Sequence, residues 1–113
     1  MKMTFQGREF QFWQYRVSHG ELLVRSPKHG NDLLNVDLMF VGVEYVDLPR
    51  FLPGLELDNA ADDDISRAAE RLGQPVDRRE VFVLQCQDRR HIVVAGVLQV
   101  AESDMEIFES PFE

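Results

Sequence analysis

The chain has 113 residues, of which 44% are hydrophobic and 28% are charged, a balance typical of one globular domain rather than of a disordered chain. Twelve basic and twenty acidic residues give a net charge of −8, which disfavours binding to nucleic acid or to an anionic membrane. The single cysteine, Cys86, excludes an internal disulfide and a zinc site built from thiolates alone.

Alternation of polar and apolar residues dominates the start of the chain and predicts three strands. Residues 1–6 form the first, which ends at a glycine. In the second, over 10–17, the apolar residues change parity, and a β-bulge near Phe12 and Trp13 would account for the change. A turn that contains glycine leads into the third strand, over 21–26.

The middle of the chain alternates most clearly over 36–40, which predicts a half-buried strand. Gly42 permits a bend, after which residues 43–48 continue extended. Two prolines then interrupt the pattern, and 55–57 allows a short strand between acidic residues.

One helix is predicted, over 60–72, because four apolar residues are spaced to share one face. Asp58 or Asn59 can cap its start, and three consecutive aspartates in the first turn suit the helix dipole. A glycine and a proline follow and end the helix. The four residues of the apolar face are Ala61, Ile65, Ala68 and Leu72.

Two longer strands follow, over 80–87 and 91–101, and both are apolar on their two faces. Such strands lie in the centre of a sheet and are covered on both sides. Gly96 within the second predicts a bulge or close packing. We therefore expect a single α+β domain over 1–113: a mainly antiparallel curved sheet or small roll of about seven strands with one helix, and a loosely docked C-terminal tail over 102–113.

No motif for a catalytic nucleophile, a phosphate loop or a zinc site occurs in the chain. Three consecutive helical aspartates point about 100° apart, so they stabilise the start of the helix better than they hold a cation. Cys86 alternates with apolar neighbours and is expected in the core. We therefore predict no catalytic residue, no cofactor and no metal site, and we favour a protein that is not an enzyme.

Two stretches carry a resemblance to known proteins. YRVSHGELLVRS over 15–26 and VDLMFVGVEY over 36–45 are similar to small uncharacterised bacterial α+β domains. The second stretch, together with the strands over 81–101, loosely resembles bacterial toxin-immunity-type domains, in which a strand and bend of the form L-x-F-x-G-V recur. The resemblance implies a bacterial cytoplasmic protein whose acidic surface meets a basic partner.

Three functions remain open from the sequence. The first is a non-enzymatic, immunity-like interaction module, supported by acid-only stretches over 56–64 and 102–113. The second is a small-ligand-binding protein or enzyme with a pocket lined by Trp13, Tyr15, Tyr45 and phenylalanines on a concave sheet. The third, compatible with either, is a homodimer whose sheets pack face to face.

We expect a protein partner or self-association, and neither nucleic acid nor a membrane. Three polar residues in the most recognisable stretches are the candidate interaction residues: His19, Arg25 and Asp37. A cytoplasmic location is expected because the cysteine is unpaired and no apolar segment is long enough to span a bilayer.

Overall fold

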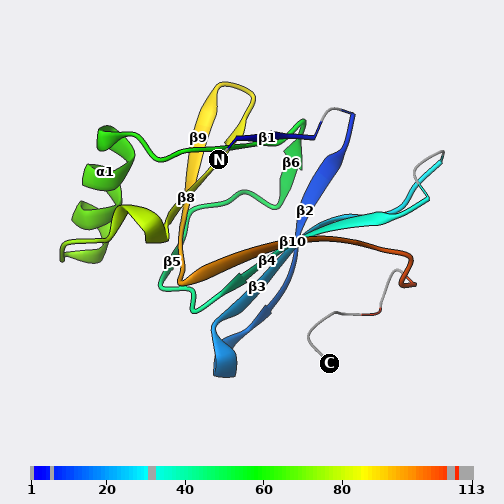
Figure 1. The fold of residues 1–113 in the computed structure, drawn as a ribbon, viewed down its shortest axis with the longest axis horizontal. Helices are drawn as coiled ribbons and strands as arrows, with labels where there is room; N and C mark the ends of the chain where they lie inside the picture. Colours follow the sequence, from blue (N-terminus) through cyan, green and yellow to red (C-terminus); the bar gives the residue numbers. More distant parts are fainter. Residues whose placement is uncertain (1, 6, 31–32, 107–108, 110–113) are drawn as a thin grey trace.

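The computed structural model describes residues 2–5, 7–30, 33–106 and 109. Over this part of the chain the backbone forms ten strands, one α-helix and two short 3-10 turns (Figure 1). In chain order the elements are β1 (Met3–Thr4), β2 (Glu9–Arg16), η1 (Val17–His19), β3 (Glu21–Ser26), β4 (Asn35–Val41), β5 (Tyr45–Val46), β6 (Phe51–Pro53), β7 (Glu56–Asp58), α1 (Asp62–Leu72), η2 (Arg78–Glu80), β8 (Val81–Cys86), β9 (Arg89–Val94) and β10 (Val97–Ser103). Neighbouring strands pair antiparallel, so the predicted α+β class is confirmed.

The strands form two sheets of five. Sheet A has the order β1-β7-β8-β9-β5, and sheet B has the order β10-β4-β3-β2-β6. β8 and β9 of sheet A run steeply across β10 of sheet B, and α1 lies beside β8 and β9 (Figure 1). The two sheets stack as layers rather than closing into a single roll. In the part of the chain that the structure describes, no helix is long and apolar enough to cross a membrane.

Apolar side chains fill two separate layers. The larger lies between the sheets, where side chains of sheet B, such as Val24 and Leu38, pack with Leu84 and Val93 of sheet A. The smaller lies between α1 and sheet A, where Ala68 packs with side chains of β8 and β9. Sheet A is therefore covered on both faces, which confirms the prediction made for β8 and for the first half of the 91–101 segment.

The predicted strand over 91–101 is instead two strands in different sheets. β9 ends at Val94 in sheet A, and β10 begins at Val97 in sheet B. Gly96 makes the transfer, donating its N–H to the Val41 carbonyl at 2.9 Å. A Cβ on Gly96 would lie only 3.4 Å from the same oxygen, so the expected close packing is present.

The prediction of about seven strands was wrong because the chain also changes sheet repeatedly between residues 45 and 58. β5 belongs to sheet A, β6 to sheet B and β7 again to sheet A. Gly54, with φ of +70°, supports the reversal between β6 and β7. Each of these strands is two or three residues long, too short for a period to be recognised.

The bulge predicted near Phe12 and Trp13 is confirmed. The pairing of β2 with β3 shifts between Phe12 and Gln14, which leaves Trp13 as the extra residue. Phe12 packs against the core between the sheets, whereas Trp13 lies beside Arg25. The shift therefore re-aims the tryptophan without loss of the sheet.

The helix begins two residues later than predicted, and neither Asp58 nor Asn59 caps it. Its N-cap is Ala61, whose N–H donates to the Asp64 carboxylate at 2.8 Å. Asp58 is engaged elsewhere, because Arg90 donates to its carboxylate at 2.8 Å. The acidic first turn was expected, but its main partner is an arginine of β9.

The expected docking of the tail over 102–113 can be followed in part. Ser103 still belongs to β10, and the carbonyls of Met105 and Glu109 accept hydrogen bonds from Asn35 and Arg25. Residues 107–108 and 110–113 of the predicted tail lie outside the described residues.

Candidate functional site

The structure brings together two of the three residues singled out in the sequence. Arg25 and Asp37 lie directly opposite each other on β3 and β4. Arg25 Nε donates to one carboxylate oxygen at 2.7 Å and Nη2 to the other at 3.1 Å. Both side chains are almost fully buried, at 0% and 2% exposure. They form a bidentate ion pair within the protein.

Further groups cover this ion pair on the outer face of sheet B. The Arg25 guanidinium lies 5.5 Å from the centre of the Trp13 ring, and its Nη1 donates to the Glu109 carbonyl at 2.8 Å. The pair thus ties β3 to β4 and to the segment that follows β10. This position makes it a structural anchor of sheet B rather than an exposed contact surface.

His19 does not join these residues. It lies in η1, the turn before β3, whereas Arg25 is near the far end of that strand. Its ring Nδ1 is 2.8 Å from the Ser18 hydroxyl, an interaction local to the turn.

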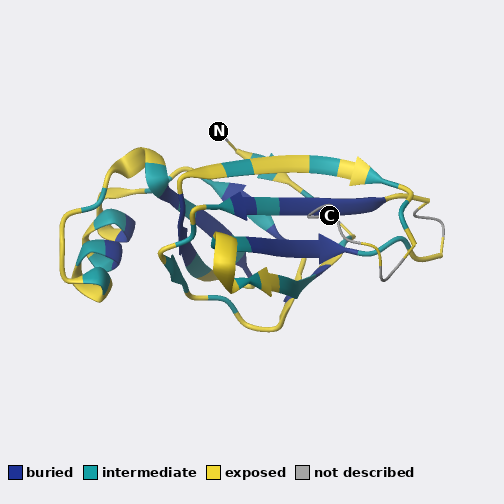
Figure 2. Ribbon diagram, turned by 90° about the horizontal axis from the view of Figure 1, so that it is seen from below, coloured by how far each residue is buried: buried dark blue, intermediate teal, exposed yellow. Residues whose placement is uncertain are grey.

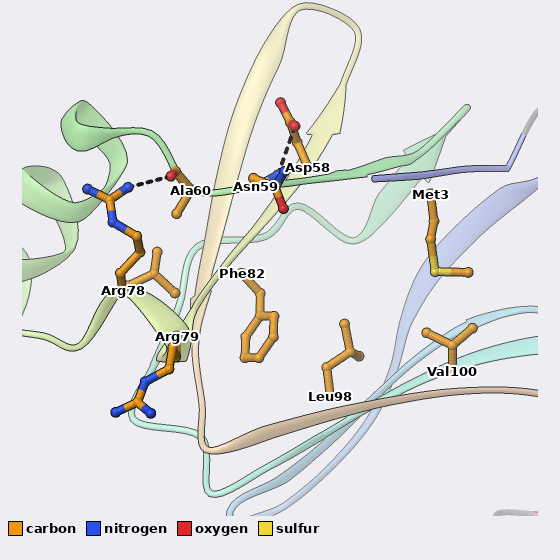
Figure 3. Close-up of a pocket in the computed structure, with 10 residues that line it drawn as sticks. Met3, Asp58, Asn59, Ala60, Arg78, Arg79, Phe82, Leu98 and Val100 are labelled. Atoms are coloured by element: carbon orange, nitrogen blue, oxygen red, sulfur yellow. Dashed lines mark hydrogen bonds between the residues drawn. The ribbon is translucent and has the colours of Figure 1, made fainter. Parts of the chain in front are cut away.

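A cleft with a volume of about 720 Å³ lies between the two sheets (Figure 3). Apolar side chains enter it from both sides: Phe82 from β8, Met3 from β1, and Leu98 and Val100 from β10. A volume of this size falls in the range of about 300–1,000 Å³ typical of binding pockets. The cleft is therefore the candidate functional site.

Two arginines mark one end of the cleft. Arg78 donates to the Ala60 carbonyl at 2.7 Å and pairs with Asp62. Arg79 is 89% exposed and bonds to Asp77 through Nε and Nη2. These hydrogen bonds lower the pKa of Asp77 to about 2 and raise the pKa of Arg79, so both groups stay charged at neutral pH.

The cleft borders the free edge of β10. Within the described residues β10 pairs only with β4, on one side, and it is the longest of the four edge strands. Figure 2 shows β10 exposed beside the buried strands β4 and β3. Val97 and Val100 are 49% and 36% exposed on it. An edge of this kind presents unpaired N–H and C=O groups to another strand.

The two acidic stretches differ in how far they are neutralised. In the first, over 56–64, Lys2, Arg78 and Arg90 pair with four carboxylates. In the second, over 102–113, none of the described carboxylates takes part in an ion pair; these belong to Glu102, Asp104, Glu106 and Glu109. The uncompensated acidic charge thus begins where β10 ends.

A cluster of ion pairs that includes Asp58 of the cleft holds the start of the helix. Arg90 of β9 donates to Asp64 at 2.7 Å and to Asp58 at 2.8 Å. Burial alone would raise the pKa of Asp64, but the hydrogen bonds from Arg90 and from the Ala61 amide lower it overall. The hydrogen bond from Arg90 likewise lowers the pKa of Asp58, and both carboxylates raise the pKa of Arg90.

Cys86 lies in the core, as predicted, and its thiol donates to the Pro53 carbonyl at 2.9 Å. Burial raises the pKa of this thiol, which disfavours the reactive thiolate. Among the described side chains, no group of three or more His, Cys, Asp or Glu gathers as metal ligands would.

Sequence reasoning missed the residues that line the cleft. Of the aromatic side chains proposed for a pocket, a phenylalanine, Phe82, lines it, whereas Trp13 lies by Arg25 and Tyr45 packs towards α1. The adjacent arginines before β8 were a visible signal, but their place at the cleft depends on how the sheets cross.

Comparison with family models, with curated proteins and with solved structures found no match to this chain.

Proposed function

We propose that this protein is a non-enzymatic, immunity-like interaction module that binds an extended segment of a basic partner protein along β10. The observation that carries the proposal is the free edge of β10 beside an apolar cleft. A segment that pairs with this edge would gain backbone hydrogen bonds, and its alternate side chains would enter the cleft.

Charge favours a different protein over a second copy as the partner. Each copy has a net charge of −8, so two copies repel each other, whereas a basic protein is attracted. The uncompensated carboxylates that begin at Glu102 supply this attraction next to the binding edge. We place this interaction in the bacterial cytoplasm, where an unpaired cysteine stays reduced.

The test uses two matched valine substitutions. Val100→Lys puts a charge at the cleft, while Val17→Lys changes an equally apolar residue that is 80% exposed in η1. We expect protein captured by the wild type to be retained by Val17→Lys and lost by Val100→Lys. If the lysine variant does not fold, Val100→Thr replaces it in the test, because threonine keeps the shape of the valine side chain and adds a polar hydroxyl.

Hydrogen exchange then locates the contact. The β10 amides that do not pair with β4 should become protected in the complex, and binding should weaken as salt is raised. Capture that is equal for both folded lysine variants, or protection confined to another surface, would overturn the proposal. Sedimentation of the protein alone would reveal self-association if the edge instead pairs with a second copy.

A small ligand is the second candidate occupant, favoured by the volume of the cleft and by the arginines at its end. The ligand class would be an apolar anion, with its charged group at Arg79. This function would be supported if the wild type binds a naphthalene sulfonate dye, if Val100→Lys abolishes that binding, and if no protein partner is captured.

A further inference from the structure

The two ends of β10 offer different groups to a bound segment: paired arginines lie beside its start, and, among the described residues, carboxylates without an ion pair lie at its end. Ala95, just before β10, donates its N–H to the Glu80 carbonyl at 2.9 Å, which places the arginine-bearing turn η2 at the start of the strand. Glu102 is near the end of the strand, and Asp104 and Glu106 follow it. A segment bound along this edge would therefore meet the exposed Arg79 guanidinium at one end and carboxylates at the other.

Resting on the proposed function, we propose that β10 binds its partner segment antiparallel, with basic residues first, alternating apolar residues next, and an acidic residue or terminal carboxylate last. In this orientation the first residues of the segment lie beside Glu102 and Asp104. Its last residues lie beside Arg79.

The antiparallel direction follows from the sheets themselves. Every strand pair in the described structure is antiparallel, including that of β10 with β4. Antiparallel pairing is also slightly more stable per residue. With the direction fixed, the positions of the charges dictate the order of residues in the segment.

The apolar part of the segment is set by the cleft. Leu98 and Val100 both point into it from β10, Leu98 next to Phe82 and Val100 towards Met3 (Figure 3). A neighbouring strand in register would direct every second side chain to the same face. Two or three apolar residues at alternate positions therefore match the cleft.

Arg79 has the capacity to receive a carboxylate. Its side chain is 89% exposed, and its bonds to Asp77 use Nε and Nη2, so Nη1 has no partner among the described residues. A second carboxylate at Nη1 would meet a charge-assisted donor without displacing Asp77.

Two synthetic peptides of identical composition test the order of residues. One contains two lysines, three threonine–valine repeats and two glutamates, and the other begins with the glutamates and ends with the lysines. Both are acetylated and amidated, so that their ends have no charge. Binding is measured by titration calorimetry, and the site is located from shifts of the β10 amides in NMR spectra.

We expect the lysine-first peptide to bind about tenfold more tightly than the reversed one, because reversal removes the carboxylate from Arg79 and places glutamates beside Glu102 and Asp104. Arg79→Glu should abolish this preference. Arg71→Glu, which changes an exposed arginine in the last turn of α1, should preserve it.

Equal binding of the two peptides at β10, or tighter binding of the reversed one, would overturn the proposed order while leaving the interaction function intact. Failure of both peptides to shift the β10 amides would also overturn the proposed segment. The interaction function is then decided separately by the paired valine variants and the captured partner.

Discussion

Replacement of either residue in the ion pair between Arg25 and Asp37 leaves the other charge buried without its partner. Asp37→Leu removes the two carboxylate oxygens that accept from the guanidinium at 2.7 and 3.1 Å, while Arg25→Met removes the two nitrogens that donate to this carboxylate. Breaking a buried pair in this way costs about 3–5 kcal/mol of unfolding free energy. That is a large part of the roughly 5–15 kcal/mol that stabilises a typical domain.

The double variant should be less destabilised than the sum of the two single variants, because it leaves no isolated charge. We expect a coupling free energy of about 2 kcal/mol or more between the two sites. Recovery will be incomplete, since Arg25 also contacts Trp13 and donates to the Glu109 carbonyl.

Urea denaturation of the four proteins measures this coupling. The fluorescence of Trp13, the only tryptophan, reports the transition, and far-ultraviolet circular dichroism checks it because substitution of Arg25 changes the surroundings of the indole. Arg25→Lys keeps the charge but lacks the fork that bonds both oxygens, so it should fall between wild type and Arg25→Met. Coupling below about 0.5 kcal/mol would refute the argument that mutual compensation stabilises these buried charges.

Three further changes test other parts of the fold. Asp64→Asn should cost about 2 kcal/mol at neutral pH. Folding lowers the pKa of Asp64, so the difference in unfolding free energy between wild type and variant should have its full size at pH values above the pKa of the unfolded state, near 3.8. Below that pH the difference should shrink. Denaturation curves at several pH values measure it. Gly20→Ala, at φ of +58° and with its Cβ 3.3 Å from the Val43 nitrogen, should lower thermal stability more than Gly7→Ala, which meets nothing within 4 Å. The Cys86 thiol should react with a disulfide reagent at least about 100-fold faster in denaturant than in the native protein, and fast native reaction would contradict its burial.

Local patterns in the sequence predicted much of the fold because they arise from contacts within one strand or helix. Alternation identified β2, β3 and β4, and the change of parity at Phe12 identified the bulge. The apolar face of α1 was likewise recognised, with Ile65 and Ala68 packed on sheet A. These features need no knowledge of the partner strand.

The distribution of strands between two sheets was not predictable from those patterns. An apolar residue such as Leu98 gives the same sequence pattern in a central strand and in an edge strand. The alternation shows which face of the sheet the side chain lies on, but it does not show which strand lies next to it. The residues of the candidate site were hard to predict for the same reason, because their contacts depend on neighbouring strands. Arg25 and Asp37 could be recognised as polar residues within apolar strands, but their direct pairing depends on the register of β3 with β4. The cleft depends on the crossing of the sheets.

The transfer of the chain at Gly96 links the stability of the fold to its open edge. Residues on either side of this glycine belong to different sheets, so the close contact with Val41 joins the two layers of the sandwich. The same transfer places β10 at the edge of sheet B, where β4 lies on one side of it and the cleft adjoins the other.

Covering this edge with another strand of the domain would require the chain to return beside β10. The segment after Ser103 instead turns to the outer face of sheet B, where Asn35 and Arg25 hold its carbonyls. Arg25 therefore has two roles in sheet B, because it forms the buried ion pair with Asp37 and also binds the Glu109 carbonyl on the outer face of the sheet.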